Sequence, residues 1–205
     1  MGNFNDYYRN ITGHLQIAKQ FPSGEEEIIF DDHNVIVSGM SVGLSYLFTA
    51  SGSDSIVDYQ LSRFQLGVSG NDTAGSGIYQ MSANLSSFDE YGGAAGPLRL
   101  VSSIQIKNGN TTTMEVFAQI PHSHVTRIND TSVRYTIILD RDAVNNVRPV
   151  GPAGSATLAL NEIGLFMKNP RGGLPTQTIL VAYRKFSDII KTSDFTLVFR
   201  WTINW

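Results

Sequence analysis

The last eleven residues, Phe195-Thr196-Leu197-Val198-Phe199-Arg200-Trp201-Thr202-Ile203-Asn204-Trp205, alternate in character along their whole length. Every odd position carries a large apolar side chain, and the even positions are polar except for Val198. Because successive side chains of a strand point to opposite faces, this stretch is expected to be a β-strand with one apolar face. Burial of three or more of those side chains, at roughly 1.5–3 kcal/mol each, would make the strand a main wall of the core.

A β-hairpin is predicted upstream, where Ser103–Lys107 and Thr111–Ile120 flank Asn108-Gly109-Asn110. Asn and Gly tolerate positive φ, and Asn-Gly between alternating segments is a strong hairpin signal. The even positions of both arms are apolar, so each arm is expected to present one apolar face. A second hairpin turn is expected at Pro22-Ser23-Gly24.

Further strands are indicated by shorter alternating runs at Leu15–Phe21, Glu26–Phe30, Leu61–Val68, Val133–Leu139, Leu158–Phe166 and Ile179–Phe186. In the fifth of these runs the apolar phase slips between Leu160 and Ile163, which indicates a β-bulge near Asn161-Glu162. One helix is predicted, near residues 38–49. Its apolar residues fall at helical spacing and Ser38 can cap it, although Gly39 and Gly43 weaken it.

These elements predict a mainly β chain, an antiparallel β-sandwich or a jelly-roll-like fold with about eight or nine strands and one short helix. We expect a single domain over residues 1–205, with an N-terminal arm over residues 1–14. A long loop without periodicity, over residues 70–96, is rich in Gly, Ser, Asn and Ala. Such a loop either reaches onto a neighbouring subunit or is a plain flexible connection.

The composition excludes several classes of function. The net charge is −3 and no cluster of Lys or Arg occurs, so we expect no nucleic-acid partner. The absence of cysteine excludes disulfides, Cys-ligated zinc and thiol catalysis. No apolar run approaches the roughly 20 residues that cross a bilayer, and the first residues lack the order of a signal peptide. We therefore expect a soluble protein, made in a cytosol, with no membrane partner.

Charged residues make up only 16% of the chain, against roughly a quarter in ordinary soluble proteins. A polar but uncharged surface costs less to desolvate than a charged one, which favours a chain covered by other chains. A monomer that merely has few charges remains the alternative.

The sequence predicts no enzyme, no cofactor and no catalytic residues. It contains no nucleophile elbow, P-loop, zinc-protease motif or dinucleotide fingerprint. The acidic runs Glu25-Glu26-Glu27 and Asp31-Asp32 are expected at a hairpin turn and a strand end, where they form a solvated face. Acid–base work would instead need two carboxylates in different environments across a cleft.

His122-Ser123-His124 is the sharpest candidate for a metal site. If this run were a strand, both imidazoles would point to one side and could share a metal ion. A histidine pair alone is more often a loop or hydrogen-bonding feature, so we predict no metal site. Exposed tyrosines could instead stack on sugars or anchor a protein partner, and their spacing favours neither; they are Tyr7, Tyr8, Tyr79 and Tyr91.

Several segments occur in an order that resembles the structural proteins of tailed-bacteriophage virions, of the tail, collar, fibre or decoration type. The C-terminal segments are Asn161–Phe166, Ile179–Phe186, Ile189–Thr192 and Leu197–Ile203, which are similar to a family pattern E-x-G-L-F, A-R-K-x-F, I-x-K and W-T-I. Tyr183, between the Ala and the Arg, departs from that pattern. Upstream, Asp32–Gly39 with the helix, and then Arg63–Gly70, resemble the front half of the same proteins.

The resemblance covers about half of the chain, and it implies a virion β-sandwich subunit without catalytic residues. We accordingly expect a structural subunit in the capsid, neck or tail of a phage particle, assembled in the cytoplasm of the host bacterium. Its expected partners are other virion proteins and copies of itself. The alternative is a fibre-like module that binds a host receptor or a glycan.

Overall fold

The computed structural model describes residues 11–37, 39–67, 105–108, 111–114, 118–143, 159–168 and 178–205. Over these residues the chain is mainly β, with one α-helix, and every strand pairing is antiparallel. No helix in the described ranges is long and apolar enough to cross a membrane. The strands are β1 (Thr12–Gln20), β2 (Glu26–Ile36), β3 (Leu61–Gly67), β4 (Gln105–Asn108), β5 (Thr111–Met114), β6 (Ala118–Gln119), β7 (Val125–Asn129), β8 (Ser132–Leu139), β9 (Leu160–Lys168), β10 (Thr178–Ile189) and β11 (Thr196–Asn204).

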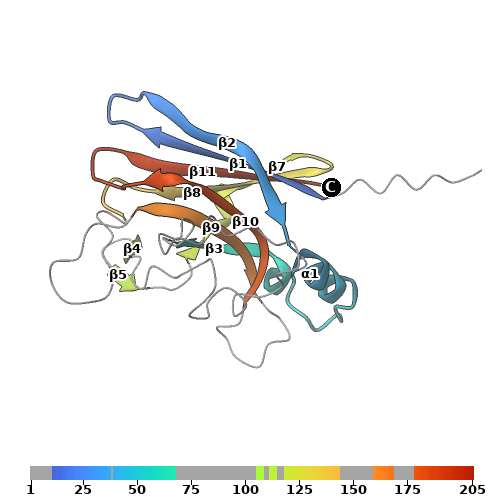
Figure 1. Ribbon diagram of the computed structural model, residues 1–205. Helices are drawn as coiled ribbons and strands as arrows, with labels where there is room; N and C mark the ends of the chain where they lie inside the picture. Colours follow the sequence, from blue (N-terminus) through green and yellow to red (C-terminus); the bar gives the residue numbers. More distant parts are fainter. Residues whose placement is uncertain are drawn as a thin grey trace, which may run out of the picture.

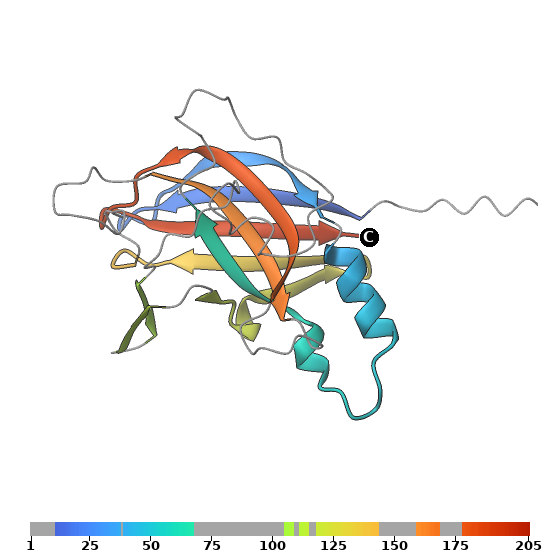
Figure 2. The ribbon, with the colours of Figure 1, turned by 60° about the horizontal axis from the view of Figure 1, so that its bottom comes forward.

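Nine of the described strands form one sheet, in the order β6-β3-β9-β10-β2-β1-β11-β8-β7. The sheet curls into two layers because β2 belongs to both: its residues up to Asn34 pair with β1, and Val35 and Ile36 pair with β10. At the other side, the outermost strands β6 and β7 are separated along the chain only by residues 120–124. The two layers cross obliquely (Figures 1 and 2), which confirms the predicted mainly β, sandwich-like class.

The C-terminal strand β11 lies between β1 and β8 and lines the space between the layers. Leu197, Phe199, Trp201 and Ile203 are all buried, as the alternation predicts. They pack in one core cluster with side chains of both layers, among them Leu15 of β1 and Leu165 of β9. The alternating sequence is therefore explained by one core face and one outer face.

The hairpin turn predicted at Pro22-Ser23-Gly24 is present. The backbone N–H of Gly24 donates to the carbonyl of Phe21 at 2.9 Å, and Gly24 has a φ of 87°, a conformation that favours glycine. The hairpin predicted around Asn108-Gly109-Asn110 is formed by β4 and β5, in which Asn108 pairs with Thr111. The side chains of its two arms, the predicted loop over residues 70–96, and Tyr7, Tyr8, Tyr79 and Tyr91 lie outside the described residues.

The central strand β9 is buried on both faces, from Leu160 through Met167. This double burial explains why its sequence does not alternate, because neither face meets water. A register shift does occur at the predicted place: Lys185 of β10 pairs with Glu162, and the next pair joins Ile189 to Leu160. The extra residues belong to β10, so the bulge predicted in β9 lies on its partner strand.

Two parts of the chain differ from their predictions. Residues 12–14, predicted within an N-terminal arm, already pair with β2 or β11 as part of β1. The sequence also does not indicate the edge strand β7, whose five side chains are exposed or half-buried. An edge strand of this kind buries little apolar surface, so it needs no alternating pattern.

Candidate functional site

An apolar groove opens at one end of the sandwich, between the single α-helix and the layer that contains β8 and β11. The helix, α1 (Gly39–Phe48), and the C-terminus lie together at this end (Figure 1). The groove has a volume of about 570 Å³, within the range of roughly 300–1,000 Å³ typical of binding pockets. Its lining, hereafter the α1 groove, is formed by Ile11, Met40, Gly43, Leu44, Leu47, Phe48, Tyr59, Gln60, Leu61, His122, Val125, Val133, Tyr135, Met167, Ile203 and Trp205.

The position of α1 follows from its first residues and from one glycine. The backbone N–H of Val37 donates to the carbonyl of Val181 in β10, at 2.9 Å, which ties the start of the helix to the sheet. Gly43 then faces Met167 of β9, because a Cβ added to Gly43 would lie 2.1 Å from the methionine sulfur. This glycine, which weakens the helix in sequence terms, lets α1 approach the sheet and form one wall of the groove.

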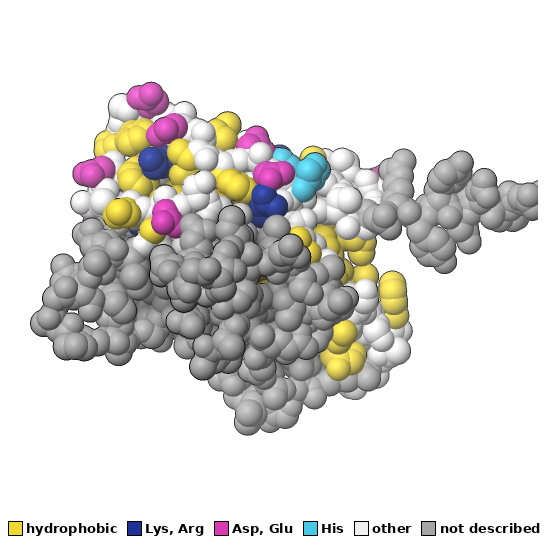
Figure 3. All heavy atoms as spheres, viewed as in Figure 1, with side chains coloured by type: hydrophobic (Ala, Val, Ile, Leu, Met, Phe, Trp, Pro, Cys, Tyr) yellow, Lys and Arg dark blue, Asp and Glu magenta, His cyan; other side chains and the backbone are white. Residues whose placement is uncertain are grey.

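Two aromatic side chains at the rim of the groove are open to solvent. Phe48, at the end of α1, is 82% exposed, and Trp205 is 46% exposed. The backbone of Trp205 is held in place because its N–H donates to the carbonyl of Thr131 at 3.0 Å. Yellow side chains reach the surface over the α1 end of the molecule (Figure 3). Exposed aromatic groups beside an apolar hollow are typical of binding surfaces.

The lining of the α1 groove carries no Asp, Glu, Lys or Arg. Its polar groups are few: Gln60, His122 and the hydroxyls of Tyr59 and Tyr135. Burial raises the pKa of Tyr135 to about 12, so this phenol stays protonated and can donate a hydrogen bond throughout the physiological range. Such a lining is suited to an uncharged, largely apolar occupant.

A second, smaller apolar feature crosses the outer face of the layer that contains β2, β1, β11 and β8. Ile28, Ala18, Val198 and Ile138 stand side by side on β2, β1, β11 and β8, as the registers show. The two middle residues are buried, whereas Ile28 is 54% exposed and Ile138 is 41% exposed. This row, hereafter the outer-face row, explains why Val198 breaks the alternation of the last strand.

The histidine pair singled out in the sequence does not have the geometry of a strand. His122–His124 form a short 3₁₀ turn, so the two imidazoles do not share a strand face. The strand arrangement that a shared metal ion would require does not occur, because the chain turns at Pro121–His124, between β6 and β7. His122 instead joins the lining of the α1 groove. Among the described residues, no three His, Asp or Glu side chains gather closely enough to hold a metal ion.

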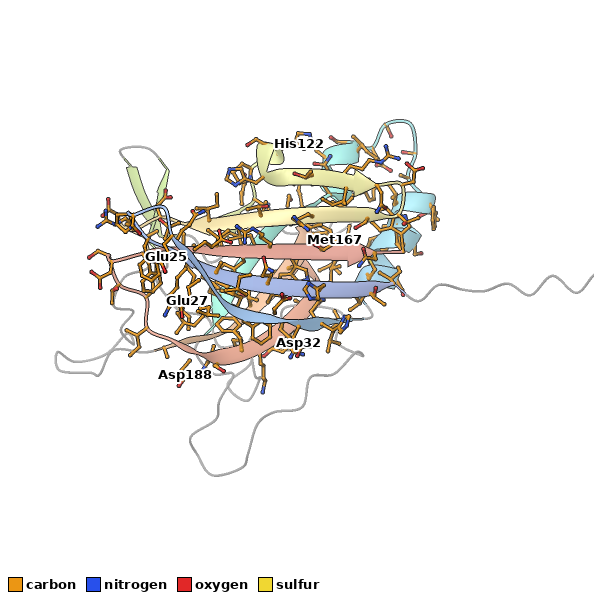
Figure 4. All side chains as sticks on the ribbon, turned by 90° about the horizontal axis from the view of Figure 1, so that it is seen from above. Glu25, Glu27, Asp32, His122, Met167 and Asp188 are labelled. Carbon is orange, nitrogen blue, oxygen red and sulfur yellow. The ribbon has the colours of Figure 1, made fainter. Side chains whose placement is uncertain are left out.

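The carboxylates of the acidic runs are spread along β2. Glu25 and Glu27 lie at the β1–β2 turn, and Asp32 lies farther along the strand (Figure 4). One carboxylate of each acidic run forms an ion pair with an arginine of another strand. Glu26 binds Arg200, with 2.7 Å between the charged atoms, and Asp32 binds Arg184. His14 contacts Asp31 at 2.7 Å, and its ring packs edge-on against His33. These contacts link strands of the sheet at its surface: His14 and Arg184 reach β2 from the adjacent strands β1 and β10, and Arg200 reaches it from β11, across β1.

Residues of the segments Asn161–Phe166, Ile179–Phe186 and Ile189–Thr192 have structural contacts. The hydroxyl of Tyr183 donates to the carboxylate of Glu162 at 2.5 Å, in the buried part of β9 and β10. The ammonium of Lys191 donates to the backbone carbonyl of Thr192 at 2.7 Å and to that of Arg141 at 3.4 Å, which fastens one loop to another. These contacts hold strands and loops together, and Ile203, which ends the segment Leu197–Ile203, lines the α1 groove.

Sequence reasoning missed the α1 groove as a site, because its walls come from α1, β7, β8, β9 and β11, which are distant in the chain. The available signal was the placement of large apolar residues where an alternating or helical pattern ends, at Phe48 and Trp205. Searches with the chain find no matching family model, no matching curated protein and no matching solved structure.

Proposed function

We propose that the chain is a non-enzymatic structural subunit of a tailed-phage particle, which binds other virion proteins and copies of itself. The observation that carries the binding part of this proposal is the α1 groove, an uncharged apolar hollow with Phe48 and Trp205 exposed at its rim. Leaving such a surface in water is unfavourable, and covering it with a protein partner removes that cost.

The phage-particle part of the proposal rests on the order of the sequence segments from Glu162 to Ile203 and from Asp32 to Gly70. Two further properties support it. Only 16% of the residues are charged, so little charge must be desolvated when neighbours cover the surface. The curled antiparallel sheet also provides a rigid frame on which an interface can be held.

The groove is less suited to a glycan, which is the alternative occupant. Sugar hydroxyls need several polar partners, and Gln60, His122 and two tyrosine hydroxyls are the polar side-chain groups of this lining. Exposed Trp205 could stack on a sugar ring, but its neighbours at the groove are aliphatic or aromatic.

Imaging of intact particles by electron cryo-microscopy tests the proposal. We expect density for this chain at a fixed, symmetric position, with the α1 groove covered by a neighbouring chain. A binding assay with host cell-surface polysaccharide separates the alternative. Saturable polysaccharide binding by the purified chain, lost in Trp205→Ala, together with a groove that is open in the particle, would refute the structural role and favour the receptor-binding module.

A further inference from the structure

We infer, on the basis of the assembly role proposed above, that the α1 groove binds the aromatic N-terminal segment, residues 1–10, of a second copy of the chain. The contact would join two different surfaces, a segment on one copy and a groove on the next. A contact of this heterologous kind propagates from subunit to subunit and closes into a ring when the rotation allows. The groove would thus direct self-assembly.

The first argument is the place where the segment joins the described fold. Ile11 lines the α1 groove, and the next residue, Thr12, begins β1 opposite Asn204 near the end of β11. Residues 1–10 are therefore attached at the groove end of the sandwich. Ten residues can extend up to roughly 33–36 Å, so the segment can reach beyond the groove end of its own subunit.

The second argument is the match in chemistry. Residues 1–10 contain three aromatic side chains, Phe4, Tyr7 and Tyr8, and their two charged side chains, Asp6 and Arg9, are of opposite sign. The groove is apolar, has no charged side chain and has aromatic groups at its rim. Aromatic side chains bury a large area, and a tyrosine hydroxyl in the groove would find Gln60 or His122 as a hydrogen-bonding partner.

The third argument concerns which copy supplies the segment. A segment that continued in line with β1 would lead away from its own subunit, and entering that subunit's groove would then need a turn immediately before Ile11, because Thr12 is already paired in β1. A reverse turn takes four residues, here Tyr8–Ile11, so Tyr8 would be consumed by the turn instead of filling the groove. Donation to a second copy needs no such reversal and leaves all three aromatic residues available.

Site-specific cross-linking of the full chain tests the inference. A photoreactive residue is introduced by Tyr7→p-benzoylphenylalanine, which keeps an aromatic group at this position. Equal amounts of the variant at natural isotope abundance and ¹⁵N-labelled chain without the photoreactive residue are mixed, irradiated and digested. We expect cross-links from position 7 to peptides that contain residues 44–48 or 203–205. Because a photoreactive segment can meet the groove of an unlabelled or of a labelled copy, products whose two peptides carry different labels should form beside products of the same label.

Two exposed apolar residues provide a matched pair of controls. Phe48→Asp places a charge at the rim of the groove and should reduce the mixed-label product by roughly ten-fold, as loss of an aromatic anchor does at other interfaces. Ile28→Asp makes the same kind of change on the outer-face row, where the side chain is 54% exposed, and should leave the product unchanged. Both positions are exposed, so neither substitution disturbs the core.

Every result of the cross-linking experiment either supports or overturns the proposed occupant of the α1 groove. Groove cross-links that join only peptides of the same label, with no mixed-label product, show that the segment occupies its own groove. Cross-links elsewhere, or none at all, show that the groove has another occupant. Each of these results overturns the inference. If the chain is found in phage particles but gives no mixed-label product at the groove, the inference fails and the structural role stands. If mixed-label product forms but particles lack the chain, the structural role fails while the self-association remains.

Discussion

Leu15 and Trp201 face each other across the ladder between β1 and β11, and both side chains are completely buried. On its other side Trp201 pairs with Tyr135 of β8. Trp201 therefore lies on the middle strand of β1, β11 and β8, and its indole ring packs in the core between the two layers of the sandwich. The free energy of folding should depend on this ring more than on most other side chains of the strand.

Trp201→Ala should reduce the free energy of unfolding by about 3–5 kcal/mol, because truncation of a buried Trp removes apolar contacts and leaves a cavity. A loss of that size is comparable with the whole stability of many domains, so the variant is expected to be insoluble or unfolded at room temperature. Urea denaturation followed by circular dichroism, or recovery in the soluble fraction, measures the effect.

Two controls accompany this substitution. Thr202 lies on the outer face of the same strand and accepts one long hydrogen bond from Arg134, at 3.3 Å, so Thr202→Ala should be mild. Trp201→Phe should cost less than Trp201→Ala, since it leaves a smaller cavity and since the indole N–H has no hydrogen-bond acceptor among the described residues. Near-normal melting of Trp201→Ala together with collapse of Thr202→Ala would contradict the core assignment.

The sequence predicts the strands of this fold where one face is buried and the other is wet. β1 and β11 are of this kind: Leu15 and Ile17 are buried opposite Trp201 and Phe199, and their neighbours Gln16 and Arg200 are only partly buried. The helix also follows from spacing, and α1 begins and ends within one residue of its predicted bounds. The two-residue alternation of the strands and the helical spacing of α1 have the same origin: each element has one face toward the core and one face toward water.

The sequence predicts less where that boundary is absent or is formed by distant segments. β9 is buried on both faces, so its register with β10 depends on the residues opposite and not on its own pattern. The α1 groove depends on how close the helix lies to the sheet, which is set by the contact between Gly43 and Met167. No local rule relates those two residues, so the site became visible only in three dimensions.

Gly67→Ala should destabilise the fold, because Gly67 makes room for a buried carboxylate. Gly67 pairs with Glu162, and a Cβ at Gly67 would lie 2.3 Å from Oε1 and 2.4 Å from Cγ of that side chain. Glu162 is fully buried and accepts a hydrogen bond from Tyr183, so it cannot move without cost. We expect a loss of about 1–3 kcal/mol in thermal or urea unfolding, in the range of other overpacked cores.

Gly52→Ala is the matched control for that substitution. A Cβ at Gly52 would meet no atom within 4 Å, so the same chemical change should leave stability almost unaltered. Equal effects of the two substitutions would show that the contact with Glu162 does not cause the loss at Gly67.

Lys191 should make stability rise at alkaline pH. Its side chain is only 1% exposed, and burial lowers its pKa from 10.5 to about 8, against the opposing influence of nearby Asp140 and Asp142. Between about pH 8 and 10.5 the unfolded chain thus binds more protons at this residue than the folded chain does. The contribution of Lys191 to the free energy of unfolding therefore increases with pH across this window.

Urea denaturation of the natural chain and of Lys191→Met, at several pH values across the same window, measures the effect. Lys191→Met keeps the apolar stem but has no ionisable group, so the natural chain should gain stability relative to the variant as pH rises. Parallel pH profiles for the two proteins would show that Lys191 has an ordinary pKa in the folded state.

The ion pair between Arg200 and Glu26 joins β11 to β2 across β1, and it should stabilise the fold only while Glu26 is ionised. The two guanidinium nitrogens donate to the two carboxylate oxygens at 2.8 and 2.7 Å, and one of them also donates to Gln16 at 3.0 Å. The hydrogen bond from Arg200 holds the pKa of Glu26 below its ordinary value of 4.5. A lowered carboxylate pKa adds stability above the unfolded-state pKa, and this is lost as the pH falls through the folded-state pKa.

Glu26→Gln keeps the shape of the side chain and removes its charge. Because both partners remain partly exposed, at 24% and 30%, we expect the natural chain to be more stable at neutral pH by no more than about 1 kcal/mol. The difference should shrink in high salt and vanish at a pH below the lowered pKa of Glu26. Glu27→Gln is the control: the charged atoms of Glu27 and Lys19 are 3.8 Å apart and Glu27 is 54% exposed, so its loss should have no measurable effect. A pH-independent difference for Glu26→Gln would mean that the amide disturbs the packing of the outer face, and that the charge of Glu26 contributes nothing to stability.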